Sequence, residues 1–174
     1  MAAALTALIV GASRGLGFSL AEEWLKRNAH VIATQRGPSR ELVTLQVRYP
    51  GSLEIETVDI ADAAAVRALR QRLNGRRLDV LFVNAGICKA NEETPSTVDE
   101  EDFVDMMLTN ALSPMRFVEL YEDLVPGSGV IAVMTSELGS IASNRGFWEL
   151  FKAALNMLMK CFVNKHGIRT PLLG

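Results

Sequence analysis

Short apolar runs alternate along this chain with longer amphipathic stretches, and that alternation constrains the fold more than any other feature. Five apolar runs are predicted to be strands: Leu5–Val10, His30–Thr34, Leu53–Val58, Leu78–Val83 and Val130–Met134. Five stretches with helical periodicity separate or follow them: Phe18–Asn28, Glu41–Arg48, Asp62–Leu73, Asp99–Val125 and Trp148–Val163. Apolar strands joined by helices predict a parallel sheet with helices on both faces. We expect one α/β domain over residues 1–174, without repeats or linkers.

Composition excludes several classes of protein. The 174 residues are 49% hydrophobic and 22% charged, which is typical of a globular domain and not of a disordered chain. A net charge of −2 provides no positive field for nucleic acid or an anionic membrane. The apolar N-terminus has no basic residue before it, and no run approaches the ~18 residues of a membrane span. Cys88 and Cys161 form neither a disulfide framework nor a zinc motif, so we expect a cytoplasmic protein without a metal.

Glycines and polar residues gather where the predicted strands end. They are Gly11–Gly17, Gln35–Arg36, Asp59, Asn84–Gly86 and Thr135–Ser136. In open α/β sheets, ligands bind in the crevice outside the carboxyl ends of the strands. The sequence therefore predicts a ligand site along this one edge of the sheet.

The loop Gly11–Gly17 joins the first strand to the first helix with the spacing G-x-x-x-G-x-G. Glycines allow a tight turn and let the backbone approach a phosphate, and a helix N-terminus offers unpaired N–H groups to an anion. The loop lacks the Gly-Lys-Ser/Thr of a P-loop. A nucleotide phosphate is the favoured ligand, and a tight turn without a ligand is the alternative.

The residues after the second strand indicate which nucleotide. An NAD site usually has an acidic residue there, whereas this chain reads Thr34-Gln35-Arg36. Arg14 lies within the glycine loop, and two guanidinium groups suit a 2′-phosphate. We therefore expect NADP(H) rather than NAD(H), with two solvated surface arginines as the alternative. The same Arg36 disfavours an S-adenosylmethionine methyltransferase, which would want an acidic residue at that point.

Together these motifs resemble the short-chain dehydrogenase/reductase family, and most closely its C-factor-like branch. The segments that carry the resemblance are Gly11–Gly17, Asp59, Asn84–Gly86, Ser136–Ile141 and Lys152–Asn156. The resemblance implies a doubly wound parallel sheet, the Rossmann fold, with strand order 3-2-1-4-5. It implies hydride transfer between NADP(H) and a small-molecule carbonyl or alcohol, and a homo-oligomer formed through the two late helices.

The resemblance also assigns site residues. It implies that Asn110, Ser136 and Lys152 are catalytic. The implied cofactor-binding residues are Gly11, Ser13, Arg14, Gly15, Leu16, Gly17, Arg36, Asp59, Ile60, Asn84, Ala85, Gly86 and again Lys152. The residues themselves support one of these, because Pro114 has no N–H to give the Asn110 carbonyl in a helix. Read alone, Asn110 fits a proline-kinked helix, Ser136 a loop and Lys152 a solvated helix residue.

Two departures from the family pattern weaken the catalytic assignment. The family has Tyr-x-x-x-Lys, and keeping this spacing places Trp148 at the tyrosine position, four residues before Lys152. A second alignment places Phe151 at the tyrosine position, with three residues missing before Lys152. Tyr49 and Tyr121 are the only tyrosines, and losing a general acid removes roughly 10²–10⁴-fold in rate. The family's sixth strand, which precedes a segment like Gly167–Thr170, and its final strand and helix are also absent. Missing residues, a shortened paralogue and an altered chain all remain open.

These departures leave two functions open. The first is an NADP(H)-dependent carbonyl or alcohol oxidoreductase. The second is a dinucleotide-binding protein without turnover, acting as a sensor or a binding module, and the missing tyrosine favours it.

Overall fold

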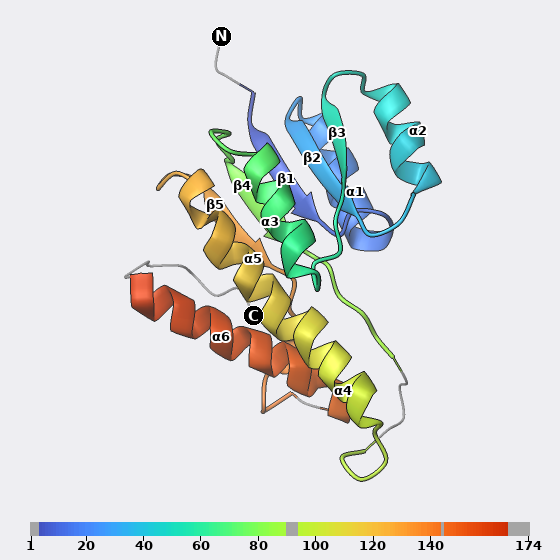
Figure 1. The fold of residues 1–174 in the computed structure, drawn as a ribbon, viewed down its shortest axis with the longest axis vertical. Coiled ribbons are helices and arrows are strands. Elements are labelled where there is room, and N and C mark those ends of the chain that lie inside the picture. The colour runs from blue at the N-terminus through green and yellow to red at the C-terminus, as the bar shows by residue number, and fades with distance from the viewer. Residues whose placement is uncertain (1–3, 90–93, 144, 167–174) are drawn as a thin grey trace. The chain divides into compact units, whose positions relative to one another are not determined.

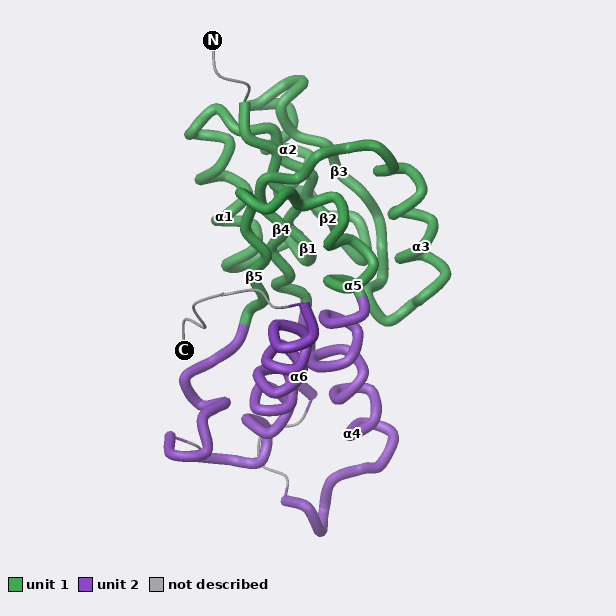
Figure 2. The backbone as a smooth tube through the Cα atoms, turned by 90° about the vertical axis from the view of Figure 1, so that its left-hand side faces the viewer, with its two compact units in different colours: residues 1–85, 117–134 green, residues 86–116, 135–174 purple. Residues whose placement is uncertain are grey.

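The computed structural model describes residues 4–89, 94–143 and 145–166. The chain forms two compact units. Unit 1 contains residues 1–85 and 117–134, drawn green in Figure 2, and unit 2 contains residues 86–116 and 135–174, drawn purple. The expectation of a single domain over the whole chain stays a prediction.

Unit 1 contains a five-stranded sheet in the order β3-β2-β1-β4-β5, in which every neighbouring pair is parallel. The strands are β1 (Thr6–Val10), β2 (His30–Gln35), β3 (Leu53–Thr57), β4 (Val80–Val83) and β5 (Val130–Val133). The register places Leu8 beside Ile32 on one side and beside Leu81 on the other. All three side chains are fully buried, as expected for central strands. The predicted α/β class and strand order are confirmed.

Helices α1 (Gly15–Lys26) and α2 (Arg40–Arg48) pack on one face of this sheet. Their buried residues join those of the strands in one apolar core cluster: Ile9, Ala12, Ala21, Leu25, Val31, Ala33, Leu42, Leu45 and Leu53. Helix α3 (Ala63–Arg72) lies on the opposite side of the sheet from α1 (Figure 1). Ser39 caps the N-terminus of α2 and Asp62 caps that of α3, and these caps fix where the two helices begin.

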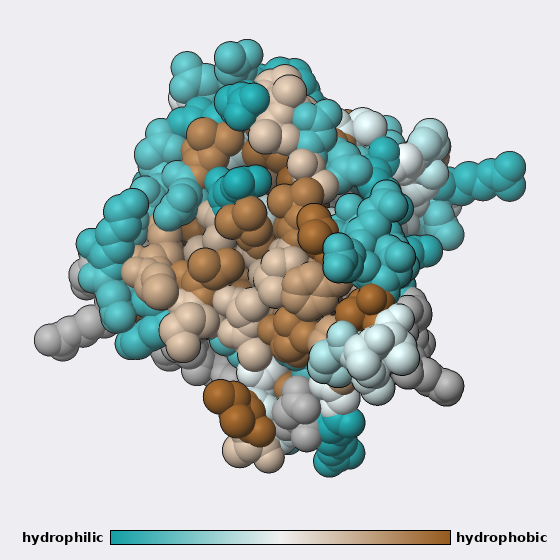
Figure 3. Space-filling model, turned by 60° about the horizontal axis from the view of Figure 1, so that its bottom comes forward, coloured by the Kyte–Doolittle hydropathy of each residue, from teal (hydrophilic) through white to brown (hydrophobic). Residues whose placement is uncertain are grey.

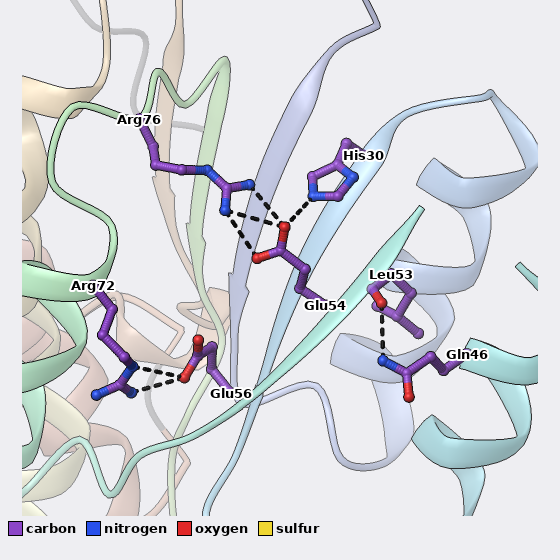
Figure 4. Close-up of polar contacts among 7 residues, drawn as sticks. All are labelled: His30, Gln46, Leu53, Glu54, Glu56, Arg72 and Arg76. Carbon is purple, nitrogen blue, oxygen red and sulfur yellow. Dashed lines mark hydrogen bonds and ion pairs between the residues drawn. The ribbon is translucent and has the colours of Figure 1, made fainter. Parts of the chain in front are cut away.

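The two edge strands of the sheet differ from the apolar pattern of the centre. Glu54 and Glu56 lie on β3, where they meet arginines that follow or end α3 (Figure 4). A charged edge discourages pairing with another chain. At the other edge, β5 pairs only with β4 within the described ranges, and Val130 is 54% exposed.

The predicted helix over Asp99–Val125 is wrong in its continuity. The structure has α4 (Glu100–Met107), a π-helical turn at Leu108–Leu112, α5 (Ser113–Tyr121) and a 3₁₀ turn at Glu122–Leu124. Within the π-helical turn the Ser113 N–H donates to the Leu108 carbonyl, one residue further back than in an α-helix. Pro114 follows directly and has no N–H of its own, which favours this local change of hydrogen bonding.

Unit 2 is completed by short turns and one long helix. A 3₁₀ turn at Glu137–Gly139 follows β5, and another at Phe147–Glu149 leads into α6 (Leu150–His166). Three phenylalanines and Trp148 form an aromatic cluster in this unit, with Phe103 and Phe151 centroids 5.5 Å apart. The predicted loop Asn91–Thr97 lies partly outside the described residues, and the segment Gly167–Thr170 lies wholly outside them.

Candidate functional site

The N-terminus of α1 has no side-chain cap, in contrast to those of α2, α3 and α4. Arg14 occupies the capping position without a side-chain hydrogen bond, and the first turn of α1 has no acidic residue. Helices α2, α3 and α4 are each capped by a side-chain oxygen, from Ser39, Asp62 and Asp99 respectively. The first N–H groups of a helix need acceptors, and an anion supplies them best. The bare terminus of α1 is therefore suited to a phosphate.

Two glycines of the loop are required by the close approach of other backbone. Gly11 has a φ of 84°, and a Cβ there would lie 2.7 Å from the backbone N and Cα of Ala85. A Cβ on Gly17 would lie 2.2 Å from the Gly11 carbonyl oxygen and 2.7 Å from the Asn84 amide nitrogen. Nothing lies within 4 Å of the corresponding position on Gly15. The loop is thus closed against the protein at Gly11 and Gly17 and open at Gly15.

The end of β2 holds the glycine loop in place. The buried Thr34 hydroxyl accepts a hydrogen bond from the Gly11 N–H at 2.9 Å, and its carbonyl accepts one from Ala12 at 2.8 Å. The Ser39 hydroxyl, also buried, donates to the Ser13 carbonyl at 2.8 Å. Thr34 and Ser39 were not among the predicted site residues. Buried hydroxyls at the end of a predicted apolar strand are the signal that could have found them.

Asn84 holds the loop from the end of β4. Its side-chain N–H donates to the Gly11 carbonyl at 2.9 Å, and its backbone N–H, like that of Ala85, donates to the Val10 carbonyl at 2.9 Å. The resemblance assigns Asn84 to the cofactor. In the structure its amide nitrogen is bonded to the loop, so that Asn84 fixes the position of Gly11.

The remaining predicted cofactor residues of unit 1 lie around this loop or at neighbouring strand ends. The side chains of Arg14 and Arg36 are exposed, and neither side chain makes a hydrogen bond or ion pair with any described residue. Leu16 is 53% exposed. One carboxylate oxygen of Asp59 accepts from the Ala61 N–H at 2.9 Å, and Ile60 is buried. These residues, the open Gly15 and the bare α1 terminus fit a dinucleotide phosphate with guanidinium groups nearby.

Asn110 in unit 2 clamps the chain that follows β4. Its side-chain oxygen accepts from the Ile87 N–H and its side-chain nitrogen donates to the Ile87 carbonyl, both at 2.8 Å. Asn110 is 5% exposed and lies within the π-helical turn. The predicted role rests on its backbone carbonyl, whereas the amide side chain fixes Ile87 and hence the adjacent predicted site residue Gly86.

Lys89 adds a second clamp two residues further on, which sequence reasoning missed. Its ammonium group lies 2.7 Å from an oxygen of Asp102 and 2.6 Å from an oxygen of Asp105, both on α4. These carboxylates hold the pKa of Lys89 well above its usual range. The spacing of the two aspartates on one helix face was visible in the sequence, but their common partner was not.

Ser136 and Lys152 are brought toward the same stretch of α6. The Thr135 hydroxyl donates to the side-chain oxygen of Asn156 at 2.6 Å. A Cβ on the buried Gly139 would lie 3.0 Å from Lys152, so the backbone after Ser136 packs directly on that residue. Burial lowers the pKa of Lys152, and the Ser136 oxygen accepts from the Leu138 N–H at 3.2 Å.

Neither tyrosine belongs to the unit that holds Lys152. Tyr49 and Tyr121 are both in unit 1. The Tyr121 hydroxyl is buried and donates to the Val66 carbonyl at 2.9 Å, and burial raises the pKa of Tyr121 far above its usual range. One helical turn before Lys152, where the family pattern has a tyrosine, this chain has Trp148, and no tyrosine of unit 2 replaces it.

Within residues 4–89, 94–143 and 145–166, no three or more His, Cys, Asp or Glu side chains are grouped so as to hold a metal ion. No helix in the described part of the chain combines the length and hydropathy that crossing a bilayer requires.

Comparison with known proteins decides the family. The model of the short chain dehydrogenase family matches residues 5–170. The chain belongs to the short-chain dehydrogenase family. This confirms the family-level resemblance, and with it the Rossmann-like fold that places both glycine loop and Asn84 at the carboxyl edge of the sheet.

Two solved structures are similar to this short-chain dehydrogenase. One is described as a short-chain dehydrogenase/reductase from Burkholderia multivorans with bound NADP. It is 46% identical, with a TM-score of 0.91, over 95% of this chain and 74% of that one. The other is a carbonyl reductase from Pseudomonas aeruginosa PAO1 in complex with NADP. It is 34% identical, with a TM-score of 0.89, over 94% of this chain and 74% of that one.

Two curated relatives are more distant in sequence. A 1-hydroxy-2-glutathionyl-2-methyl-3-butene dehydrogenase of Rhodococcus sp. is 28% identical over 97% of this chain and 75% of its own length. The oxidoreductase UcpA of Escherichia coli is 29% identical over 94% of this chain. The chain spans 65% of the length of UcpA.

Proposed function

We propose that this chain binds NADP(H) through unit 1 and serves hydride transfer between that cofactor and a carbonyl or alcohol. The observation that carries the proposal is the bare N-terminus of α1 behind a glycine loop that three side chains hold open. Those side chains are Thr34, Ser39 and Asn84. Relatives of the same family crystallised with NADP support the choice of cofactor.

Arg14 and Arg36 are the proposed ligands of the 2′-phosphate. Both are exposed and make no ion pair with a described residue, and no carboxylate follows β2 to hold a ribose hydroxyl. Calorimetry should give tighter binding for NADPH than for NADH. Arg36→Ala should weaken NADPH binding by about 10- to 100-fold, as expected for a charged hydrogen bond, and leave NADH unchanged.

Arg67→Ala is the matched control for this experiment, because Arg67 is exposed on α3 and its side chain has no hydrogen bond or ion pair among the described residues. It should leave the affinity for both nucleotides unchanged. Equal affinity for NADPH and NADH, or an equal loss from both arginine variants, would contradict the assignment.

In unit 2, Ser136 and Lys152 are the proposed groups that hold the reacting oxygen. When bound, the nicotinamide supplies or accepts the hydride. The Ser136 hydroxyl donates to the substrate oxygen, and Lys152, whose pKa burial lowers, supplies charge or a proton nearby. Asn110 keeps the adjacent chain at Ile87 in position. Lys152 is also proposed to contact the cofactor, as the family resemblance implies.

A second candidate function is binding of the dinucleotide without turnover. Trp148 favours it, because an indole stands one turn before Lys152 and cannot act as an acid near neutral pH. Incubating the chain with NADPH and activated ketones separates the two functions. Loss of absorbance at 340 nm supports hydride transfer, whereas protection against thermal unfolding without that loss supports the binding protein.

Assembly into a homo-oligomer through the late helices is also proposed. Val104 and Met157 are 60% and 64% exposed on α4 and α6, which is unusual for large apolar side chains. Figure 3 shows one face on which hydrophobic side chains gather within a surround of hydrophilic ones. Light scattering on the wild type and on Met157→Lys tests this: the variant should shift toward the monomer mass. A cytoplasmic location and the C-factor-like branch stay predictions.

A further inference from the structure

The turn that follows α3 in unit 1 carries the only Asn-Gly pair of the chain, Asn74-Gly75. Both residues are exposed, and the Arg76 N–H donates to the Leu73 carbonyl at 3.0 Å across them. Gly75 has a φ of 74°, and nothing lies within 4 Å of its Cβ position. The Gly75 N–H makes no hydrogen bond to a described residue. The backbone nitrogen that follows Asn74 is therefore neither hindered by a side chain nor held by an acceptor.

Arg70 contacts the side-chain amide of Asn74 from the preceding helical turn. Its Nη1 donates to the Oδ1 of Asn74 at 3.4 Å. The other two nitrogens of the guanidinium are held elsewhere in unit 1: Nε donates to the Leu120 carbonyl at 3.1 Å, and Nη2 lies 2.5 Å from an oxygen of Asp123. A guanidinium fixed by two other acceptors thus places positive charge beside the amide oxygen. That charge polarises the amide carbon toward a nucleophile.

Asn28 occupies the equivalent position after α1 and lacks both features. Each asparagine is the second residue beyond the end of its helix, and each is exposed. The residue after Asn28 is Ala29, which is 3% exposed and whose N–H donates to the Trp24 carbonyl at 3.1 Å. The side chain of Asn28 makes no hydrogen bond with a described residue. The two turns therefore differ in the nitrogen that follows the asparagine and in the guanidinium beside its amide.

We propose that Asn74 is a site of spontaneous deamidation, at which the Gly75 nitrogen attacks the side-chain amide and solvent water completes the reaction. In the first step a bond forms between the Gly75 nitrogen and Cγ of Asn74. The bond from Cγ to Nδ2 breaks, and ammonia leaves with the proton of the Gly75 nitrogen. Water then adds to either carbonyl of the cyclic imide, and the ring opens to aspartate or isoaspartate.

Arg70 assists the first step, because the amide oxygen gains negative charge as the new bond forms and the guanidinium stabilises that charge. The reaction consumes one water and needs no oxidant, cofactor or second protein. It is independent of the proposed function. Each event replaces a neutral amide by a carboxylate, so the modified chain carries one more negative charge and separates from the original on anion exchange.

The wild-type chain provides its own control. It is incubated in mildly alkaline buffer made with H₂¹⁸O, once folded and once unfolded in urea, and then mapped by mass spectrometry of its peptides. In the folded chain Asn74 should convert to two isomeric acidic products that contain ¹⁸O, while Asn28 stays an amide. The folded rate at Asn74 should be no more than about threefold below the rate in urea, because the turn is exposed. A larger deficit, or equal conversion at Asn28, overturns the inference.

Three variants test the route. Arg70→Gln removes the positive charge and should slow conversion of Asn74 about fivefold, whereas Arg67→Gln on the same helix should leave the rate unchanged. Gly75→Ala places a Cβ beside the attacking nitrogen and should slow conversion at least about tenfold. Thermal unfolding verifies that each variant is folded during the incubation. An unchanged rate in Gly75→Ala overturns the attack by that nitrogen, and an unchanged or faster rate in Arg70→Gln overturns the role of the guanidinium.

Discussion

The glycine loop of unit 1 and the Ser136–Lys152 stretch of unit 2 present donors in opposite ways. Around the loop, side-chain groups bond to the protein itself: Thr34, Ser39 and Asn84 each hold one point of the backbone. The groups left open are backbone N–H groups at the start of α1. In unit 2 the unpaired donor is a side chain, the indole of Trp148, and the Ser136 oxygen accepts from the Leu138 N–H.

This difference determines what each region tolerates. Backbone donors survive almost any side-chain change but fail when a new Cβ displaces the chain. Side-chain donors survive small backbone shifts but change chemistry with one substitution. We infer that binding of the nucleotide phosphate depends on the room that the glycines leave for the backbone. Binding of the carbonyl or alcohol substrate depends instead on which side chains are present. The following substitutions test this contrast in order of expected effect.

Gly17→Ala should have the largest effect. Its Cβ would lie 2.2 Å from the Gly11 carbonyl oxygen, which is backbone and cannot yield without moving the loop. We expect the free energy of unfolding to fall by about 3 kcal/mol and NADPH affinity to fall at least tenfold. Urea denaturation and calorimetry measure these. Gly37→Ala is the control, because nothing lies within 4 Å of its Cβ position; equal stability of the two variants would refute the steric argument.

Asn110→Ala should follow in size and affects unit 2. It removes both hydrogen bonds to Ile87 at a residue that is 5% exposed, which should lower the free energy of unfolding by about 2–3 kcal/mol. Asn84→Ala removes one side-chain bond, to Gly11, and should cost about 1 kcal/mol. Urea denaturation of both variants checks the order. A larger loss of stability from Asn84→Ala would mean that the bond to Gly11 stabilises the fold more than the two bonds to Ile87 do.

The features that could be predicted from the sequence are those whose interacting residues lie close together along the chain. Strand and helix positions depend on local periodicity, and two predicted helices begin at Asp62 and Asp99, which the structure shows as the capping residues of α3 and α4. The glycine loop was also a local signal. The bonds that hold it were not, since Asn84 and Gly11 are 73 residues apart in sequence. Spacing within one element cannot reveal a partner on another.

The π-helical turn and the edge strand β3 show two other limits. Pro114 signalled that the helical hydrogen bonding would change, but only the structure shows the Ser113–Leu108 bond that results. In β3, the alternating glutamates were treated as part of an apolar strand. Their meaning depends on Arg72 and Arg76, which the fold brings across from the end of α3 (Figure 4).

Lys152→Met tests whether the partly buried lysine destabilises the fold. Burial lowers the pKa of Lys152, so the unfolded chain binds that proton more readily than the folded one. Wild-type stability should therefore rise with pH between the lowered pKa and 10.5, the ordinary value for lysine. At pH 7 the methionine variant should be more stable by about 1 kcal/mol, and the difference should shrink toward pH 10. Thermal unfolding at several pH values measures this, and a gap that widens with pH would contradict it.

Glu54→Gln should have the smallest effect, because this ion pair at the edge of β3 is partly exposed. Glu54 accepts from Arg76 at 2.9 Å and lies 2.8 Å from the His30 ring, and the bond from Arg76 lowers the pKa of Glu54. We expect a loss below about 1 kcal/mol at pH 7 after solvent screening. Because the folded pKa is depressed, this contribution is complete above 4.5 and disappears as pH falls through the lowered value. Glu119→Gln, exposed and without a partner among the described residues, is the control; urea midpoints that respond equally in both variants would show that the edge pair contributes nothing.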